Sequence, residues 1–171
     1  MTNLRPALSQ DAPALATLGR EAFCSAFGHI YHPSDLSRFL EEAYSPGTIA
    51  QEISDPALLY RVIEQDDALI GFCKIRIKSP YSDYSNAARP IALGQLYTDP
   101  AMTGRGLGAQ LMDWVIDYAR QTGADAVQLS VYSENFGAQR FYARYGFSKI
   151  ADIDFWVGNH RDDEFLYELR L

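Results

Sequence analysis

The stretch Leu93–Leu111 combines residue types that suit the binding of an anion. An apolar, strand-like run ends just before Pro100, and three glycines then follow at alternate positions, Gly104, Gly106 and Gly108. Glycine lets the backbone adopt positive φ angles and approach a ligand closely. Because the glycines open a predicted helix, free N–H groups and the positive end of the helix dipole would face the ligand. The spacing therefore predicts a phosphate group held by main-chain atoms.

Two common phosphate motifs do not fit this turn. A P-loop needs Gly-Lys followed by Ser or Thr, and a dinucleotide fingerprint needs G-x-G-x-x-G, whereas the glycines here follow G-x-G-x-G. Asp125, near the place where a ribose-binding acid would be sought, begins the next predicted strand instead of ending it. Both motifs therefore remain minor alternatives.

The turn resembles motif A of the GCN5-related N-acetyltransferase (GNAT) superfamily, Q/R-x-x-G-x-G/A, which follows a strand of the type L-Y-V-x-P. Here the strand part spans Leu96 to Pro100, and Thr103 stands where the family has Gln or Arg. A second family motif, V-x-x-x-N-x-x-A-x-x-F-Y-x-x-x-G-F, is matched at Val131, Asn135, Ala138, Phe141, Tyr142, Gly146 and Phe147. The two motifs occur in the family's order and separation, so together they are far more specific than either alone.

The resemblance implies that acetyl-CoA lies in a V-shaped opening between strands 93–98 and 126–132. Main-chain groups around Leu96 to Thr98 would pair with pantetheine, and the N–H groups from Gly104 to Ala109 would hold the pyrophosphate. Arg105 would add a charge contact or simply be solvated. No metal is expected. The implied cofactor contacts are Leu96, Tyr97, Thr98, Thr103, Gly104, Arg105, Gly106, Leu107, Gly108, Ala109, Asn135, Phe141 and Tyr142.

In the family the amine attacks the thioester directly, without an acetyl-enzyme. By resemblance Tyr142 is the general acid that protonates the leaving thiolate, and Asn135 orients the cofactor's amide arm. A strand N–H of Leu96 or Tyr97 would stabilise the oxyanion. Periodicity alone instead favours Tyr142 as a core aromatic on the face of Ala138. A Tyr142→Phe variant separates the two interpretations.

The general base is harder to assign. An aliphatic amine has a pKa near ~10 and must lose a proton before it attacks. Many relatives carry Glu on the central strand, but the corresponding residue here is Ala92. The weak candidates are His29, His32 and Glu21, each of which also fits a structural or surface role, and a water chain is the alternative.

The surrounding pattern predicts one α+β domain over residues 1–171. The resemblance implies the GNAT fold, a single mixed, mostly antiparallel and strongly twisted sheet of about seven strands with about four or five helices and a splay between the fourth and fifth strands. Expected strands are 4–7, 58–64, 68–77, 93–98, 126–132, 147–157 and 164–171, with a turn GNHRDD before the last. Helices are expected from a cap at Ser9, from Pro33, after Ser45, from the glycine turn to Gly123, and from Ser133 or Asn135 to Gly146.

Composition narrows the class of protein. The net charge of −7 over 171 residues argues against a nucleic-acid partner, which needs a basic face. No apolar run reaches membrane-spanning length and no signal peptide is recognisable, so we expect a cytoplasmic protein without a membrane partner. Cys24 and Cys73, both in apolar surroundings, are interpreted as reduced buried thiols.

The acceptor is the least defined part of the reaction. The segment after Phe23 and the last residues resemble a bacterial polyamine (spermidine/spermine) N-acetyltransferase-like subgroup, and acids such as Glu41, Glu42, Asp83, Asp152 and Asp154 would line an acidic approach. Tyr31, Tyr81 and Tyr84 are weak candidates for the border of the acceptor channel. Three hypotheses stay open: acetylation of a small amine such as a polyamine, acetylation of protein N-termini or lysines, and a non-catalytic acyl-CoA-binding sensor. By family habit the chain could form a homodimer.

Overall fold

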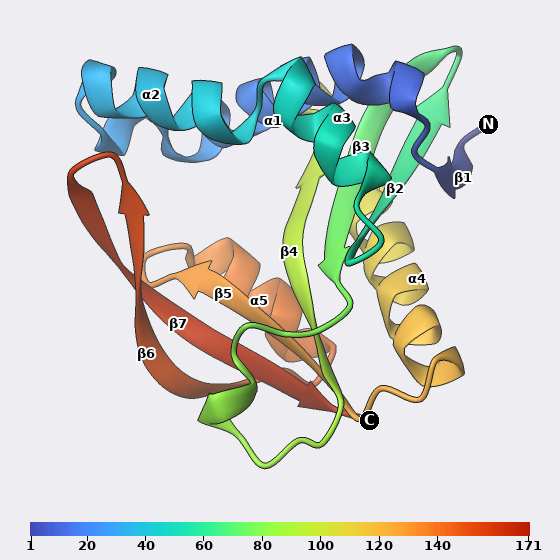
Figure 1. Cartoon of the computed structure of the whole chain (residues 1–171), viewed down its shortest axis with the longest axis vertical. Coiled ribbons are helices and arrows are strands. Elements are labelled where there is room, and N and C mark those ends of the chain that lie inside the picture. The colour runs from blue at the N-terminus through green and yellow to red at the C-terminus, as the bar shows by residue number, and fades with distance from the viewer.

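One mixed sheet of seven strands organises the chain. The computed structural model describes every residue from Met1 to Leu171, and its strand order is β1-β2-β3-β4-β5-β7-β6 (Figure 1). The strands are β1 (Asn3–Pro6), β2 (Leu58–Gln65), β3 (Ala68–Arg76), β4 (Pro90–Thr98), β5 (Ala126–Tyr132), β6 (Ser148–Val157) and β7 (His160–Arg170). The five α-helices are α1 (Ala12–Phe27), α2 (Pro33–Ala43), α3 (Pro46–Ser54), α4 (Leu107–Gln121) and α5 (Phe136–Arg144). The predicted fold class is confirmed.

The sheet opens between its two central strands. β4 and β5 are its only parallel neighbours, and they pair only from Pro90–Ala92 to Ala126–Gln128. Beyond this point β4 continues to pair with β3 as far as Thr98, while β5 pairs with β7 up to Tyr132. The strands therefore splay as predicted, and one backbone edge of β4 is left without a strand partner (Figure 1).

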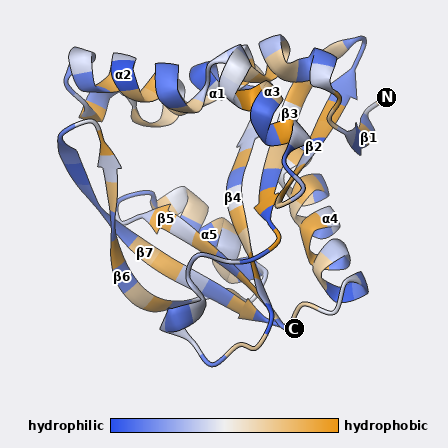
Figure 2. Cartoon of the chain, viewed as in Figure 1, coloured by the Kyte–Doolittle hydropathy of each residue, from blue (hydrophilic) through white to orange (hydrophobic).

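Two apolar clusters lie on the two faces of the sheet. Val62 and Phe72 belong to the cluster under α1 and α3, whereas Ile63 and Cys73 belong to the cluster under α4. This change of face between successive residues is the period-two alternation of strands. Figure 2 shows the apolar residues concentrated on the central strands and on the helix faces that cover them. A packed apolar layer therefore covers each face of the sheet next to the splay.

Local chain geometry defines several turns and helix starts. Asp66 and Asp67 adopt φ angles of 51° and 62°, the left-handed conformation of a tight hairpin turn. Pro46 opens α3, and the Ser45 side chain accepts the N–H of Thr48. Cys24 and Cys73 are both free thiols; Cys73 is buried as expected, whereas Cys24 is only half-buried. None of the helices is both long enough and apolar enough to cross a membrane.

Three element boundaries differ from the prediction. Ser9 does not cap α1 but begins a short 3-10 turn, because the Asp11 carboxylate accepts the Leu8 N–H and pairs with Arg5. The fourth strand begins at Pro90, where it pairs with β5, rather than at Leu93. The last strand begins at His160, so most of the predicted GNHRDD turn is strand, and only two residues, 158 and 159, connect β6 to β7.

Candidate functional site

The start of α4 has the geometry of an anion site. Gly104 and Gly106 have φ angles of 78° and 75°, and a Cβ added to either would meet nothing within 4 Å. Gly106 is the N-cap of α4 without a side-chain cap, and the first intrahelical bond runs from the Gln110 N–H to the Gly106 carbonyl. The N–H groups of Leu107, Gly108 and Ala109 therefore have no intrahelical acceptor. An open, uncapped helix start of this kind suits a pyrophosphate.

The side chains around this turn divide into buried, exposed and packed ones. Leu107 turns its side chain into the core, so only its backbone can face a ligand. Arg105 is exposed and forms no ion pair with the protein, which leaves it free to contact a phosphate. Gly108 packs against Phe141, because a Cβ at Gly108 would lie 3.6 Å from that ring.

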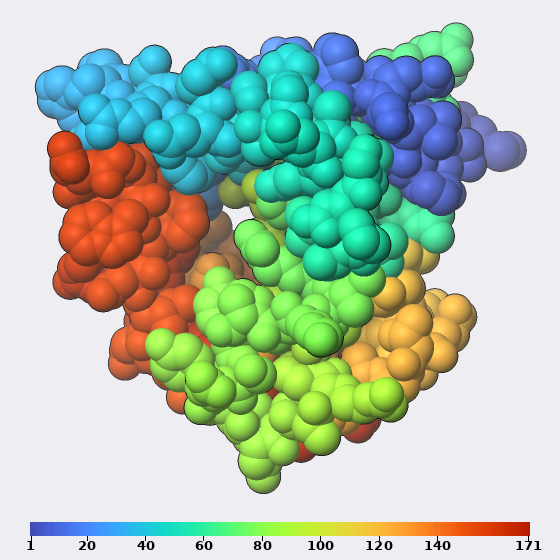
Figure 3. All heavy atoms as spheres, viewed as in Figure 1, coloured from blue at the N-terminus to red at the C-terminus, as the bar shows by residue number.

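A cavity of about 700 Å³ runs between the splayed strands, and Thr103, Gly108, Asn135, Phe141 and Tyr142 line part of it. It continues past β4 to a chamber beneath α1 and α2. Figure 3 shows an opening near the middle of the molecule, bordered by α3, the β6–β7 hairpin and the loop 78–89. The cavity therefore joins the anion site to a second compartment.

The backbone of β4 forms one wall of the opening. The Asp99 N–H donates to the Ile70 carbonyl at 2.8 Å, and hydrogen-bonded positions alternate along an antiparallel ladder. This alternation directs the N–H of Tyr97 toward β3 and the N–H of Leu96 toward the opening. Of the two predicted oxyanion donors, Leu96 is therefore the one with a suitable direction. A bulge at Gly94 lies next to these residues, as bulges beside active sites often do.

Asn135 and Tyr142 come to the cavity from α5. The Asn135 side-chain oxygen accepts the Ala138 N–H at 3.2 Å and so caps the helix, while its amide nitrogen donates to no protein group. The Tyr142 ring packs on Phe141 and Phe147, with centroids 5.4 Å and 5.8 Å away. Burial raises the pKa of Tyr142, which keeps its hydroxyl protonated. The Tyr142 ring is thus packed in the apolar core, while its hydroxyl forms no hydrogen bond with the protein and the residue lines the cavity.

The predicted bases are not brought to the cavity. Glu21, His29 and His32 are exposed, and none of them lines it. His32 instead accepts the Ser34 N–H at the start of α2. Ala92 is buried, so β4 supplies no carboxylate in its place.

Of the three tyrosines expected to border the acceptor channel, two line the cavity and one does not. Tyr31 and Tyr81 line the cavity, but the Tyr31 hydroxyl already donates to Asp162. Tyr84 is 51% exposed and lies outside the cavity. None of the acids expected to form an acidic approach lines the cavity: Glu41, Glu42, Asp83, Asp152 and Asp154. Three of them pair with surface cations, Glu41 with Arg20, Asp152 with Lys149 and Asp154 with Arg161.

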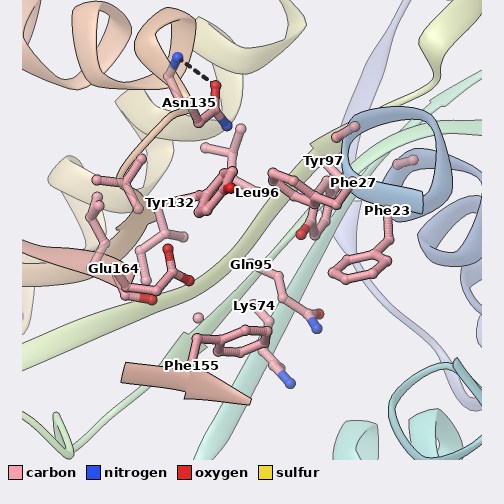
Figure 4. Close-up of a pocket in the computed structure, with 18 of the residues that line it drawn as sticks. Phe23, Phe27, Lys74, Gln95, Leu96, Tyr97, Tyr132, Asn135, Phe155 and Glu164 are labelled. Atoms are coloured by element: carbon pink, nitrogen blue, oxygen red, sulfur yellow. Dashed lines mark hydrogen bonds between the residues drawn. The ribbon is translucent and has the colours of Figure 1, made fainter. Parts of the chain in front are cut away.

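Aromatic rings form the chamber that the sequence did not reveal. The Phe23 ring lies 4.7 Å from Phe39, which in turn packs edge-on against Phe155 at 5.8 Å. Phe27 and Tyr44 complete this lining (Figure 4). These residues come from α1, α2, the α2–α3 turn and β6, so no local spacing could have indicated that they meet.

Charged and polar groups also reach the chamber. Lys74 pairs with Glu52 at 3.0 Å, and Gln95 donates to the Tyr44 hydroxyl at 3.2 Å. Glu164 projects from β7 into the cavity, opposite Gln95 and Lys74 on the other wall (Figure 4). Desolvation and the neighbouring Asp162 raise the pKa of Glu164 to about 8. Glu164 is a site residue that no sequence motif indicates. The signal available was the alternation of Asp162, Glu164, Leu166 and Glu168 along one strand face.

Comparisons with known proteins agree with this geometry. Residues 20–147 match the model of the acetyltransferase (GNAT) family. An uncharacterized N-acetyltransferase of Lactobacillus delbrueckii subsp. lactis is 25% identical over 162 residues, covering 95% of this chain and 93% of the relative. An aminoalkylphosphonate N-acetyltransferase of Salmonella typhimurium is 29% identical over 108 residues, covering 63% of this chain and 68% of the relative. The crystal structure of the PaiA N-acetyltransferase from Thermoplasma acidophilum in complex with coenzyme A superposes with a TM-score of 0.80 at 22% identity, covering 100% of this chain and 99% of that one.

Proposed function

Because the chain belongs to the acetyltransferase (GNAT) family, we propose that it moves the acetyl group of acetyl-CoA directly onto the primary amine of a small acceptor with an apolar body. The observation that carries the proposal is the continuous cavity that joins the uncapped start of α4 to the aromatic chamber. Acetyl-CoA supplies a thioester carbon for the amine to attack and a thiolate as leaving group. The protein supplies the N–H of Leu96, the hydroxyl of Tyr142 and the walls that position both partners.

The size of the acceptor follows from how the chamber is closed. The β6–β7 hairpin reaches α2, where the Asn159 N–H donates to the Asp35 carboxylate at 3.2 Å (Figure 1). Tyr31 and Asp162 add a second bond between the same two regions. A peptide that crossed the chamber between the helices and the hairpin would have to break these contacts. This favours a small molecule over a protein N-terminus or lysine.

The chemistry of the chamber favours a monoamine over a polyamine. Of the acidic groups that line it, Asp162 already bonds Tyr31 and His160, and Glu52 pairs with Lys74. Only Glu164 has a carboxylate oxygen without a partner, so one ammonium group can be matched. The aromatic walls suit an apolar chain or ring, and their π faces also attract a cation. An arylalkylamine fits these features better than spermidine.

A thiol-release assay tests this function. With acetyl-CoA as donor, we expect benzylamine or 2-phenylethylamine to support turnover at a kcat/KM at least about tenfold above spermidine, aminoethylphosphonate or a peptide, because burying an apolar body of that size is worth more than 1.4 kcal/mol. Acetylation is verified by the mass of the product. Preference for spermidine or for peptides would contradict the acceptor class. Coenzyme A binding without thiol release for any amine would favour the sensor hypothesis instead.

The glycine turn gives a separate prediction. Gly106→Val should weaken coenzyme A binding about tenfold or more, because a β-branched residue is strained at a φ of 75° and the N–H groups behind it would turn away. Isothermal titration calorimetry measures the change in Kd. Gly47→Val is the matched control, since Gly47 also has open space around it but an ordinary φ and lies in α3. Equal affinities in the two variants would exclude the turn as the pyrophosphate site.

A further inference from the structure

Two buried side-chain polar atoms in the chain have no hydrogen-bond partner. They are the Oε2 of Glu164 and the Oε1 of Gln95. The Gln95 oxygen is an acceptor, the Glu164 oxygen is an acceptor when the carboxyl is ionised, and both residues line the same cavity, one from β4 and the other from β7 (Figure 4). Buried acceptors without a donor are costly and rare in native proteins. Their concentration in one cavity indicates an occupant that donates hydrogen bonds, as a primary ammonium group does.

The position of Glu164 is set by strand pairing. It lies opposite Tyr132 of β5 and Ile153 of β6, and it shares a strand face with Asp162 and Leu166. The residue is only 8% exposed, so the surrounding side chains fix its carboxylate and solvent barely reaches it. In contrast, Glu168 on the same face accepts a hydrogen bond from the Gln128 amide at 2.8 Å and lies outside the cavity.

The charged and titratable groups around Glu164 are accounted for. On its own strand, Asp162 is tied to Tyr31 and His160. The only cations that line the cavity come from β3, and one of them, Lys74, is paired with Glu52 of α3. The groups that face Glu164 or share its cavity are Asp162 of β7, Tyr31 after α1, Tyr132 of β5, Tyr97 of β4, Tyr142 of α5, Lys74 and Arg76 of β3, Tyr81 of the loop after β3, Glu52 of α3 and Tyr44 before α3. None of them donates a hydrogen bond to Glu164.

We propose that Glu164 is the general base that accepts a proton from the bound ammonium group before the amine attacks. The proposal rests on the function proposed above. An N–H bond of the ammonium breaks, its electron pair stays on nitrogen, and an O–H bond forms on Glu164. After the C–N bond forms and the C–S bond breaks, the second proton from nitrogen neutralises the thiolate by way of Tyr142. Once the amide product has left the cavity, Glu164 returns its proton to water.

The acidity of Glu164 suits this role. An aliphatic ammonium has a pKa near ~10, so a proton passed to an ordinary glutamate would cross a pKa gap of roughly 6. Burial raises the pKa of Glu164 to about 8, which narrows the gap to roughly 2. The same burial keeps solvent away from the carboxylate, so the bound amine is its natural proton partner.

A matched pair of acceptors tests the proton transfer. Benzylamine and phenylhydrazine have nearly the same shape, but phenylhydrazine is already mostly unprotonated at neutral pH and needs no base. For Glu164→Gln we expect kcat/KM with benzylamine to fall about 100-fold or more, and with phenylhydrazine to change less than about threefold. The wild-type pH profile for benzylamine should rise with an inflection near pH 8 that the variant lacks. Glu168→Gln, a buried acid outside the cavity, should keep the wild-type profile.

Equal losses with both acceptors, or a profile unchanged in Glu164→Gln, would overturn the proposal. A second measurement does not depend on turnover. In the ¹³C NMR spectrum of the wild type, the side-chain carboxyl signal that disappears in Glu164→Gln should titrate near pH 8 and shift when benzylamine is added. Titration near 4.5, or no response to benzylamine, would refute the role of Glu164. Absence of thiol release with every amine would instead count against the acetyltransferase function.

Discussion

Tyr142→Phe should lower kcat with acetyl-CoA and benzylamine about 100-fold or more while leaving the fold intact. General acid catalysis typically contributes 10²- to 10⁴-fold, and the thiolate would leave without a proton donor in this variant. Burial raises the pKa of Tyr142, so in the wild type the hydroxyl carries its proton throughout the neutral range. The ring packs on Phe141 and Phe147 and would continue to do so in the variant.

The measurement combines initial rates with two controls. The Tyr142 hydroxyl bonds no protein group, so its removal leaves no buried partner unsatisfied and should not lower the melting temperature. Coenzyme A affinity should change less than about threefold. Tyr145→Phe is a useful comparison, because Tyr145 is the C-cap residue of the same helix but donates to Asp113 outside the cavity. A Tyr142→Phe enzyme with unchanged kcat across the pH range would show that the residue is only a packed aromatic.

Glu164→Gln should be more stable than the wild type at alkaline pH, although the same substitution lowers kcat/KM with benzylamine. The folded-state pKa of Glu164 is raised from 4.5 to about 8, so its contribution to stability is full below pH 4.5 and is lost as the pH rises through about 8. The full span corresponds to about 5 kcal/mol at 1.36 kcal/mol per pKa unit. The variant has no carboxylate to ionise and avoids this loss.

Urea unfolding at pH 5.5, 7 and 9 measures this effect. The free energy of unfolding of the wild type should fall over this range by about 3 kcal/mol relative to Glu164→Gln, with more than half of the difference appearing below pH 7 and the curve levelling off above pH 8. Glu168→Gln serves as the control for removing a buried acid from the same strand face. Parallel pH dependences for the wild type and Glu164→Gln would mean that Glu164 ionises normally in the folded state. Agreement with the prediction would show a base kept at a cost in stability, as is common at active sites.

The parts of the site that are continuous in sequence could be predicted from it. The glycine turn is indicated by its spacing, whereas Asn135 and Tyr142 are indicated only by the resemblance to the second GNAT motif; Gly108 of the turn, Asn135 and Tyr142 line one cavity. The strand Ala126–Tyr132 was predicted with the bounds that the structure has, because its apolar run is enclosed by polar residues. The absence of a carboxylate on β4 was also visible, since Ala92 occupies the position.

The acceptor chamber could not be predicted, because it is assembled from distant elements. Phe23, Phe39 and Phe155 meet only when α1 and α2 pack against the β6–β7 hairpin. Glu164 was expected as the first residue of the last strand, after a polar turn, whereas the strand already begins at His160. The burial of a carboxylate depends on what covers it, and residue type alone indicates an exposed position. The candidate bases that the sequence offers in the N-terminal region, Glu21, His29 and His32, all face solvent.

The measurement that tests the central claim most directly is the two-substrate initial-rate pattern. If the cavity holds acetyl-CoA and the amine together, double-reciprocal plots with benzylamine varied at several acetyl-CoA concentrations should intersect, and incubation with acetyl-CoA alone should leave the mass of the protein unchanged. Parallel plots together with an acetylated protein would indicate a covalent intermediate and would contradict direct transfer. Thiol release that does not depend on an amine would contradict it equally.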